Sequence, residues 1–168
     1  SLQHELLDSA EFHGIVGNSP QMWDLYSRIE RVAPHYRTVL VTGQTGTGKD
    51  LVAKSLHQLS PVADGHLVVL NCSAVVETLF ESELFGHVRG AFTGAVTDKT
   101  GLFEHAHRGT LFLDEVSELD ANAQTRLLRV LEKRSIQRIG GTEHIPVDVR
   151  IIAATHRDLE ALVREGRF

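Results

Sequence analysis

The sequence has a single cysteine, Cys72, and so cannot form a disulfide bond within the chain. Such sparing use of cysteine is typical of proteins from a reducing compartment. Long apolar runs are missing as well, since runs such as residues 151–154 are far shorter than the about 20 residues that span a bilayer. Near the start, Glu5 and Asp8 stand where a signal peptide would be basic and then apolar. We therefore expect a soluble, cytoplasmic protein with no membrane association.

An excess of basic residues is also lacking, because 17 Lys and Arg face 22 Asp and Glu and the formal net charge is -5. A nucleic-acid-binding surface is usually basic, so any contact with DNA is expected to come from a separate domain. The 168 residues are 42% hydrophobic and 23% charged, which suits one soluble globular domain with a buried core.

Short apolar runs alternate along the chain with stretches of helical spacing. Buried strands are predicted at residues 38–42, 67–70, 110–113 and 149–154. Helices are predicted after Ser19-Pro20, after residue 49, over residues 75–84, after Asp120 with Leu127, Leu128 and Leu131 inward, and from a cap at Thr155 with Asp158. This alternation indicates an α/β fold with a mainly parallel sheet and helices on both faces.

A glycine-rich segment follows the first of these strands and fits the pattern G-x-x-x-x-G-K. It consists of Gly43, Gln44, Thr45, Gly46, Thr47, Gly48 and Lys49. The glycines let the backbone curl so that successive N–H groups point at phosphate oxygens, and the lysine adds a full charge. Because a strand precedes the segment and a helix follows it, we interpret it as the phosphate loop of a P-loop NTPase. The alternative is a glycine-rich turn with a chance lysine.

Two carboxylates follow the strand at residues 110–113, namely Asp114 and Glu115. Neighbouring residues of an extended chain point to different sides, so Asp114 can face a magnesium ion while Glu115 orients and deprotonates an attacking water. Asp50 stands where P-loop proteins usually carry a Ser or Thr ligand, which makes it the weaker metal candidate. Taken alone, the acidic pair is also compatible with an ordinary exposed turn.

The hexapeptide GAFTGA comprises Gly90, Ala91, Phe92, Thr93, Gly94 and Ala95, and residues 81–87 before it read ESELFGH. With residues 43–50, 71–72, 109–115 and 149–156, it resembles the signature of the sigma-54-dependent transcriptional activators. These are the NtrC-like bacterial enhancer-binding proteins within the AAA+ ATPases. The resemblance covers nearly the whole chain from Gly14 onward. An acidic residue after the loop lysine, here Asp50, is usual in that family.

The resemblance implies that the nucleotide is ATP and that it binds with Mg²⁺. Residues at positions 14–17, with Gly14, Ile15 and Val16 among them, would line the adenine pocket, largely through backbone. Leu51, at the start of the helix after the phosphate loop, would belong to the same site.

The resemblance also implies roles around the γ-phosphate. Lys49 and Glu115 would be catalytic, and Asn71 would hold Glu115 in or out of its working position. Thr155 and His156 fall at the γ-phosphate sensor, where many relatives carry Asn in place of His156.

In the family, GAFTGA lies at the tip of a loop that extends when ATP is bound and contacts sigma-54, so that the polymerase holoenzyme opens its promoter. The glycines around Phe92 and Thr93 allow such a change, although Phe92 in an isolated sequence could equally be a core residue. Residues 137–143 lie where the family has a second, supporting loop, and an ordinary surface hairpin explains them equally well. Family members assemble as hexameric or heptameric rings.

The same resemblance suggests how the chain is divided. Residues 1–12 would be a linker or the tail of a preceding regulatory region, and residues 13–168 the α/β nucleotide-binding subdomain. The family's helical lid and its trans-acting arginines follow the segment matched here, so these 168 residues alone are expected to hydrolyse ATP poorly.

Two other functions remain open at this point, namely a different AAA+ remodelling ATPase and a nucleotide-dependent interaction module that does not hydrolyse ATP. Neither the ten histidines nor Cys72 predicts a further site. The histidines show no ligand-like grouping, and Cys72 is expected to be a small core residue without a partner base.

Overall fold

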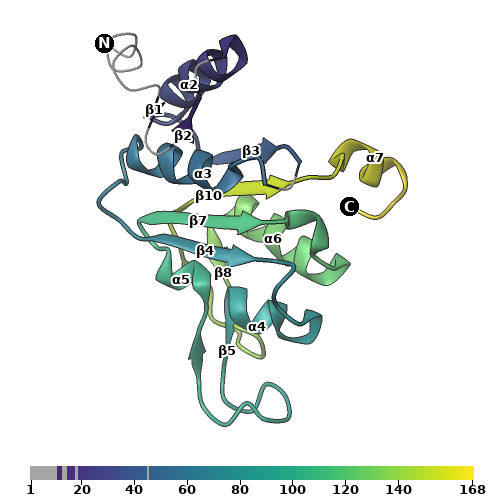
Figure 1. Cartoon of the computed structure of the whole chain (residues 1–168). Helices are drawn as coiled ribbons and strands as arrows, with labels where there is room; N and C mark the ends of the chain where they lie inside the picture. Colours follow the sequence, from purple (N-terminus) through teal and green to yellow (C-terminus); the bar gives the residue numbers. More distant parts are fainter. Residues whose placement is uncertain (1–10, 13–14, 18, 45) are drawn as a thin grey trace.

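The computed structural model describes residues 11–12, 15–17, 19–44 and 46–168 of the chain. Its centre is a sheet of four parallel strands (Figure 1). In spatial order these are β3 (Thr38–Thr42), β10 (Val149–Thr155), β7 (Gly109–Asp114) and β4 (Leu67–Asn71). All four strands run in one direction, so their carboxyl ends share one edge of the sheet. The parallel sheet predicted from the sequence is confirmed.

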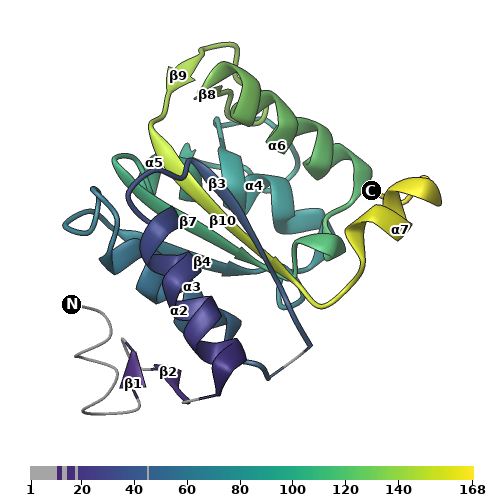
Figure 2. The same ribbon diagram turned by 90° about the horizontal axis from the view of Figure 1, so that it is seen from above.

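Helices cover both faces of this sheet, as predicted (Figure 2). One face packs against α2 (Pro20–Val32) and α3 (Lys49–Gln58), and the other against α4 (Phe80–Phe85), α5 (Leu102–His105) and α6 (Ala121–Lys133). Successive residues of β7 divide between the two cores: Leu111 and Leu113 face α4–α6, whereas Phe112 faces α2 and α3. This alternation follows from the two-residue period of a strand.

Three two-stranded antiparallel pairs lie outside the central sheet. They are β1 (Glu11–Phe12) with β2 (Ile15–Val16), β5 (Gly86–His87) with β6 (Lys99–Thr100), and β8 (Ser135–Ile136) with β9 (Ile145–Pro146). The short elements η1 (Glu77–Leu79), η2 (Val116–Glu118) and α7 (Leu159–Arg164) complete the fold. The hairpin predicted around residues 137–143 is confirmed. Of the predicted linker, residues 1–10 lie outside the described residues.

Two strands predicted to be buried are the edges of the sheet. Leu40 of β3 is 49% exposed and Val69 of β4 is 55% exposed. A run of apolar residues indicates burial but does not reveal strand order, and the order β3-β10-β7-β4 leaves β3 and β4 with one neighbour each.

The helix predictions are partly confirmed. Ser19 and Asp120 cap α2 and α6 by accepting hydrogen bonds from Met22 N and Ala123 N. The predicted inward position of Leu128 is wrong, because it is 54% exposed. Consecutive helical residues lie about 100° apart, so Leu128 cannot share the inward face of its neighbour.

Two further helix boundaries differ from the prediction. Helix α7 is capped by Asp158, whose Oδ1 accepts from Ala161 N, because Thr155 still belongs to β10. The single helix predicted over residues 75–84 is the short η1 followed by α4.

Candidate nucleotide-binding site

The predicted site residues meet at the carboxyl edge of the central sheet. In the strand register, Thr155 pairs with Thr42, and Asp114 lies between Ala154 and Asn71. Neighbouring strands are about 4.8 Å apart, so the segments that follow all four strands begin side by side. The amide of Gly43 donates to the Thr155 carbonyl at 3.3 Å, which ties the start of the phosphate loop to the end of β10.

The phosphate loop curls around its own lysine. Lys49 Nζ donates to the carbonyl oxygens of Gly43 and Gln44, both at 2.9 Å, and the residue is only 8% exposed. Gly46 and Gly48 have φ values of 82° and 84°, a left-handed conformation that favours glycine. Thr45 lies outside the described residues. The loop therefore holds one positive charge at its centre, surrounded by backbone.

Helix α3 begins at Lys49, immediately after Gly48, so its N-terminal amides lie at the loop. The positive end of the helix dipole adds to the charge of Lys49 and favours an anion there. Asp50 is exposed in the first turn, and Leu51 is half-buried.

Asp114 is the last residue of β7, and Glu115 follows it outside the strand, so the strand alternation behind the prediction does not extend to Glu115. Glu115 has φ 55° and ψ 52°, an uncommon left-handed conformation for a residue with a side chain, and its amide donates to Asp114 Oδ1 at 3.0 Å. Strained backbone of this kind is often found where a side chain must be aimed for function.

Glu115 contacts His156 rather than Asn71. His156 Nδ1 lies 2.6 Å from Glu115 Oε2, and the glutamate side chain is only 13% exposed. Asn71 is exposed at the end of β4, and its Oδ1 accepts from Ser73 N at 3.0 Å. Reasoning from sequence missed the histidine–glutamate contact because 41 residues separate the pair. The neighbouring order of β7 and β10 would have revealed it.

The remaining predicted site residues are Thr155 and those of the adenine pocket. Thr155 is fully buried, and its Oγ1 donates to Ser117 Oγ at 3.2 Å and accepts from Arg157 N. Ile15 and Val16 form β2, and Gly14 lies outside the described residues.

Cys72 follows the last residue of β4 and is 1% exposed. Its amide donates to the Asp114 carbonyl at 2.9 Å. Burial, together with the negative charges of Asp114, Glu115 and Glu118, raises the pKa of the Cys72 thiol to about 12. The prediction that Cys72 is a core residue is therefore confirmed.

In the part of the chain that the structure describes, no three His, Cys, Asp or Glu side chains gather closely enough to hold a metal ion by themselves. Within that same part, no helix has the length and apolar character needed to cross a membrane.

The GAFTGA hexapeptide lies far from the phosphate loop, in the excursion between β5 and β6 (Figure 1). The amide of Gly90 donates to the Ala95 carbonyl at 2.8 Å and closes the hexapeptide into a compact loop. Phe92 is 43% exposed, whereas Ala95 is buried.

Residues 137–143 contact the stem of this loop. Val88 N donates to Ile139 O at 3.0 Å, and Ile139 N donates to Gly86 O at 2.9 Å. Arg138 forms two hydrogen bonds to the Glu104 carboxylate of α5, both at 3.0 Å. Of the two interpretations of this hairpin, the contacts favour the supporting loop.

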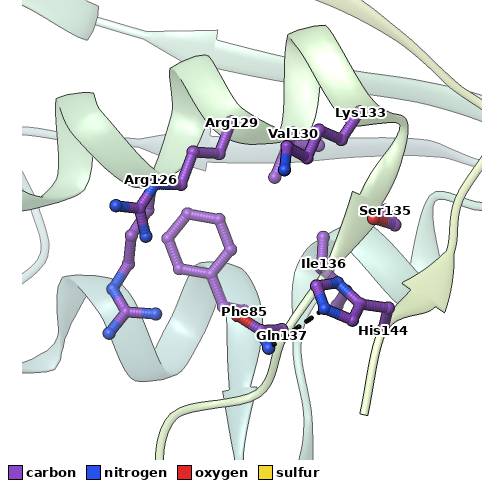
Figure 3. A pocket seen from close by; sticks show the side chains of 9 residues that line it. All are labelled: Phe85, Arg126, Arg129, Val130, Lys133, Ser135, Ile136, Gln137 and His144. Carbon is purple, nitrogen blue, oxygen red and sulfur yellow. Dashed lines mark hydrogen bonds between the residues drawn. The ribbon is translucent and has the colours of Figure 1, made fainter. Parts of the chain in front are cut away.

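A separate hollow of about 260 Å³ lies between α6 and the β8–β9 hairpin (Figure 3). Arg126, Arg129 and Lys133 reach it from α6, and His144 from the hairpin. None of the nucleotide-site residues lines it.

A parallel sheet whose carboxyl edge carries a phosphate loop and an acidic pair defines a P-loop nucleotide-binding domain. The chain belongs to the sigma-54 interaction domain family, whose model matches residues 15–168.

Regulatory protein AtoC of Escherichia coli is 48% identical over 167 residues, which are 99% of this chain and 36% of AtoC. The crystal structure of NtrX from Brucella abortus in complex with ATP superposes with a TM-score of 0.84 at 39% identity, over 99% of this chain and 35% of NtrX. The P-loop NTPase domain of a sigma-54 transport activator from E. coli shares the fold, with a TM-score of 0.59 at 21% identity, over 91% of this chain and 87% of that domain. The chain spans about a third of the length of the curated relatives it matches.

Proposed function

We propose that this chain is the ATP-binding and ATP-hydrolysing core of a sigma-54-dependent transcriptional activator that remodels RNA polymerase holoenzyme so that a promoter opens. One observation carries the proposal: a phosphate-loop lysine at the carboxyl edge of a parallel sheet and a GAFTGA loop with an exposed Phe92 occur in one small domain. Relatives such as AtoC are regulatory proteins, and NtrX was crystallised with ATP.

In this proposal the phosphates of ATP bind at the phosphate loop and the first turn of α3. Lys49 gives up its two loop carbonyls to reach the outer phosphates, and the surrounding amides and helix dipole bind the remaining oxygens. The adenine lies near β2, and Leu51 contributes to the same site. Thr155 and His156 lie at the γ-phosphate sensor: exposed His156 faces the phosphate, and buried Thr155 fixes the backbone at the end of β10.

Glu115 is the proposed general base that orients and deprotonates the attacking water. Its contact with His156 holds the carboxylate at one side of the site. We assign Asn71 a positioning role, because it stands next to Asp114 across the β4–β7 register and its amide nitrogen remains available for Glu115.

Mg²⁺ fits the donor atoms of this site. Carboxylate oxygens suit a hard cation, and Mg²⁺ is usually bound by one or two carboxylates together with phosphate oxygens and water rather than by a full protein cage. Asp114 is the main candidate ligand, directly or through water, and Asp50 the weaker one. When bound, the ion would neutralise phosphate charge.

The proposed partner surface is the GAFTGA loop, with Phe92 and Thr93 contacting sigma-54. The working form would be a homo-oligomeric ring of six or seven subunits in the bacterial cytoplasm, and DNA would be bound by a separate domain.

The test is promoter opening by polymerase with sigma-54, measured with the full-length gene product and ATP. We expect open complexes only with hydrolysable ATP, and none with Glu115→Ala. Turnover without any effect on sigma-54 would indicate a different AAA+ machine. ATP binding without turnover would indicate a non-hydrolysing interaction module.

A further inference from the structure

The phenyl ring of Phe92 packs against an imidazole of its own domain. The ring centroids of Phe92 and His87 are 5.0 Å apart, with the ring planes at 75°. This edge-to-face arrangement is a preferred geometry for aromatic pairs, because the positive edge of one ring meets the negative face of the other. Phe92 is 43% exposed, so the contact covers part of the side chain proposed to meet sigma-54.

His87 is held firmly from three directions. Its Nδ1 lies 2.8 Å from the hydroxyl of Ser82, a residue of α4 that is only 6% exposed. Its backbone pairs with Lys99 of β6 and forms a bridge to Ile139 of the second loop. Ser82 therefore orients the imidazole ring, and the two backbone contacts fix the position of the residue.

Phe92, in contrast, stands between two glycines that can act as hinges. Gly90 and Gly94 have φ values of 82° and 98°, and a Cβ atom at either position would meet no heavy atom within 4 Å. The hexapeptide is closed by its own hydrogen bonds, from Gly90 N to Ala95 O and from Ala95 N to Phe92 O. The two glycines therefore allow the segment with Phe92 and Thr93 to change its backbone conformation while His87 stays in place.

We propose that His87 is a positioning residue that seats Phe92 against the body of the domain and competes with a partner protein for the phenyl ring. Contact with sigma-54 requires Phe92 to leave this seat, and the inference rests on the proposed function in that respect. An aromatic pair of this kind shifts an equilibrium by roughly two- to ten-fold. The seat thus lowers the affinity for sigma-54 by this factor, because Phe92 must leave it before it can bind.

The seat can be tested without sigma-54. We would introduce 4-fluorophenylalanine at position 92 of this chain and record its ¹⁹F resonance without nucleotide. In His87→Ala the resonance should move toward that of the free amino acid and sharpen. His87→Phe, which keeps a ring but loses the bond to Ser82, should restore most of the wild-type shift, and Ser82→Ala should be intermediate. His35→Ala, an exposed histidine after α2, is the control.

An unchanged ¹⁹F shift in His87→Ala would overturn the seat, as would an equal change in His35→Ala. A circular dichroism melt of each variant shows whether the chain still folds. If His87→Ala does not fold, His87→Phe decides the test. A shift close to that of the wild type supports the seat, and a shift close to that of the free amino acid overturns it.

The functional consequence is measured with the full-length gene product and immobilised sigma-54. Without nucleotide, His87→Ala should retain roughly two- to ten-fold more sigma-54 than the wild type, with ATP binding unchanged. Equal retention would contradict the resting role of the seat. If the wild type captures no sigma-54 with any nucleotide, the proposed function fails, and the fluorine experiment still decides whether His87 seats Phe92.

Discussion

The nucleotide end of the molecule and the loop end are built in different ways. At the nucleotide end, the site residues follow four paired parallel strands, and backbone bonds such as Gly43 N to Thr155 O fix them. At the loop end, the GAFTGA excursion connects two strands of only two residues each, β5 and β6. The ring of His87, in β5 itself, packs on Phe92, and the second loop, which Arg138 joins to Glu104, contacts the stem through Ile139. The first arrangement suits precise chemistry and the second suits movement.

The largest expected effect is at Glu115. Replacing it by Ala should lower the ATP turnover of the full-length gene product by roughly 10²- to 10⁴-fold, the usual contribution of a general base. The affinity for ATP, measured by calorimetry, should change little. Glu118→Ala is the matched control, because that exposed carboxylate pairs with Arg157 nearby. If Glu115→Ala turned over ATP as fast as the wild type, Glu115 would not be the general base.

The rigidity of the nucleotide end is tested by the Cys72 thiol. A thiol with a pKa of about 12 instead of 9.0 has roughly 10³-fold less thiolate at pH 8, and access is also blocked by burial. We expect slow reaction with a disulfide reagent in the native protein and fast reaction in urea. Fast labelling of the native protein would show that the sheet edge opens readily.

The raised pKa of Cys72 also makes the free energy of unfolding depend on pH. The native state favours the protonated thiol, so its contribution is fully present below the unfolded pKa of about 9. The free energy of unfolding should fall as pH rises from there toward 12. Cys72→Ala should remove this part of the pH dependence.

Lys49 should show an intermediate effect. Hydrogen bonds to charged groups contribute about 1.5–3 kcal/mol, so Lys49→Ala should weaken ATP binding by roughly 10- to 100-fold. Lys54→Ala, an exposed lysine on the same helix, is the control for loss of charge. If both variants bind ATP equally well, the loop is not the phosphate site.

The smallest effect is expected at Gly140 of the loop end. Its φ is 76°, and a Cβ atom would lie 2.7 Å from the Cβ of Ala91. Gly166 has φ 73°, and a Cβ atom there would meet no heavy atom within 4 Å, so Gly166→Ala strains the backbone in the same way without a collision. Relative to Gly166→Ala, Gly140→Ala should therefore speed tryptic cleavage after the exposed Arg89 by a few-fold. Equal cleavage in both variants would mean that the second loop does not brace the first.

The same contrast explains what could be predicted from sequence. The strand and the helix on either side of residues 43–48, and the strand that ends at Asp114, were predicted correctly because their signals are local: spacing, glycines and apolar runs. The contacts of His156 with Glu115 and of His87 with Phe92 were not predicted. The first joins the ends of two strands whose adjacency the sequence does not state. The second depends on how a glycine-flanked loop folds back on its stem, which no periodicity encodes.

We propose that chemistry at the nucleotide end controls the contact made by the loop end. The most direct measurement is capture of sigma-54 by the full-length gene product with ADP–aluminium fluoride and without nucleotide, for the wild type and Phe92→Ala. We predict strong capture only by the wild type and only with the transition-state mimic. Capture that is independent of nucleotide, or that persists in Phe92→Ala, would contradict the account.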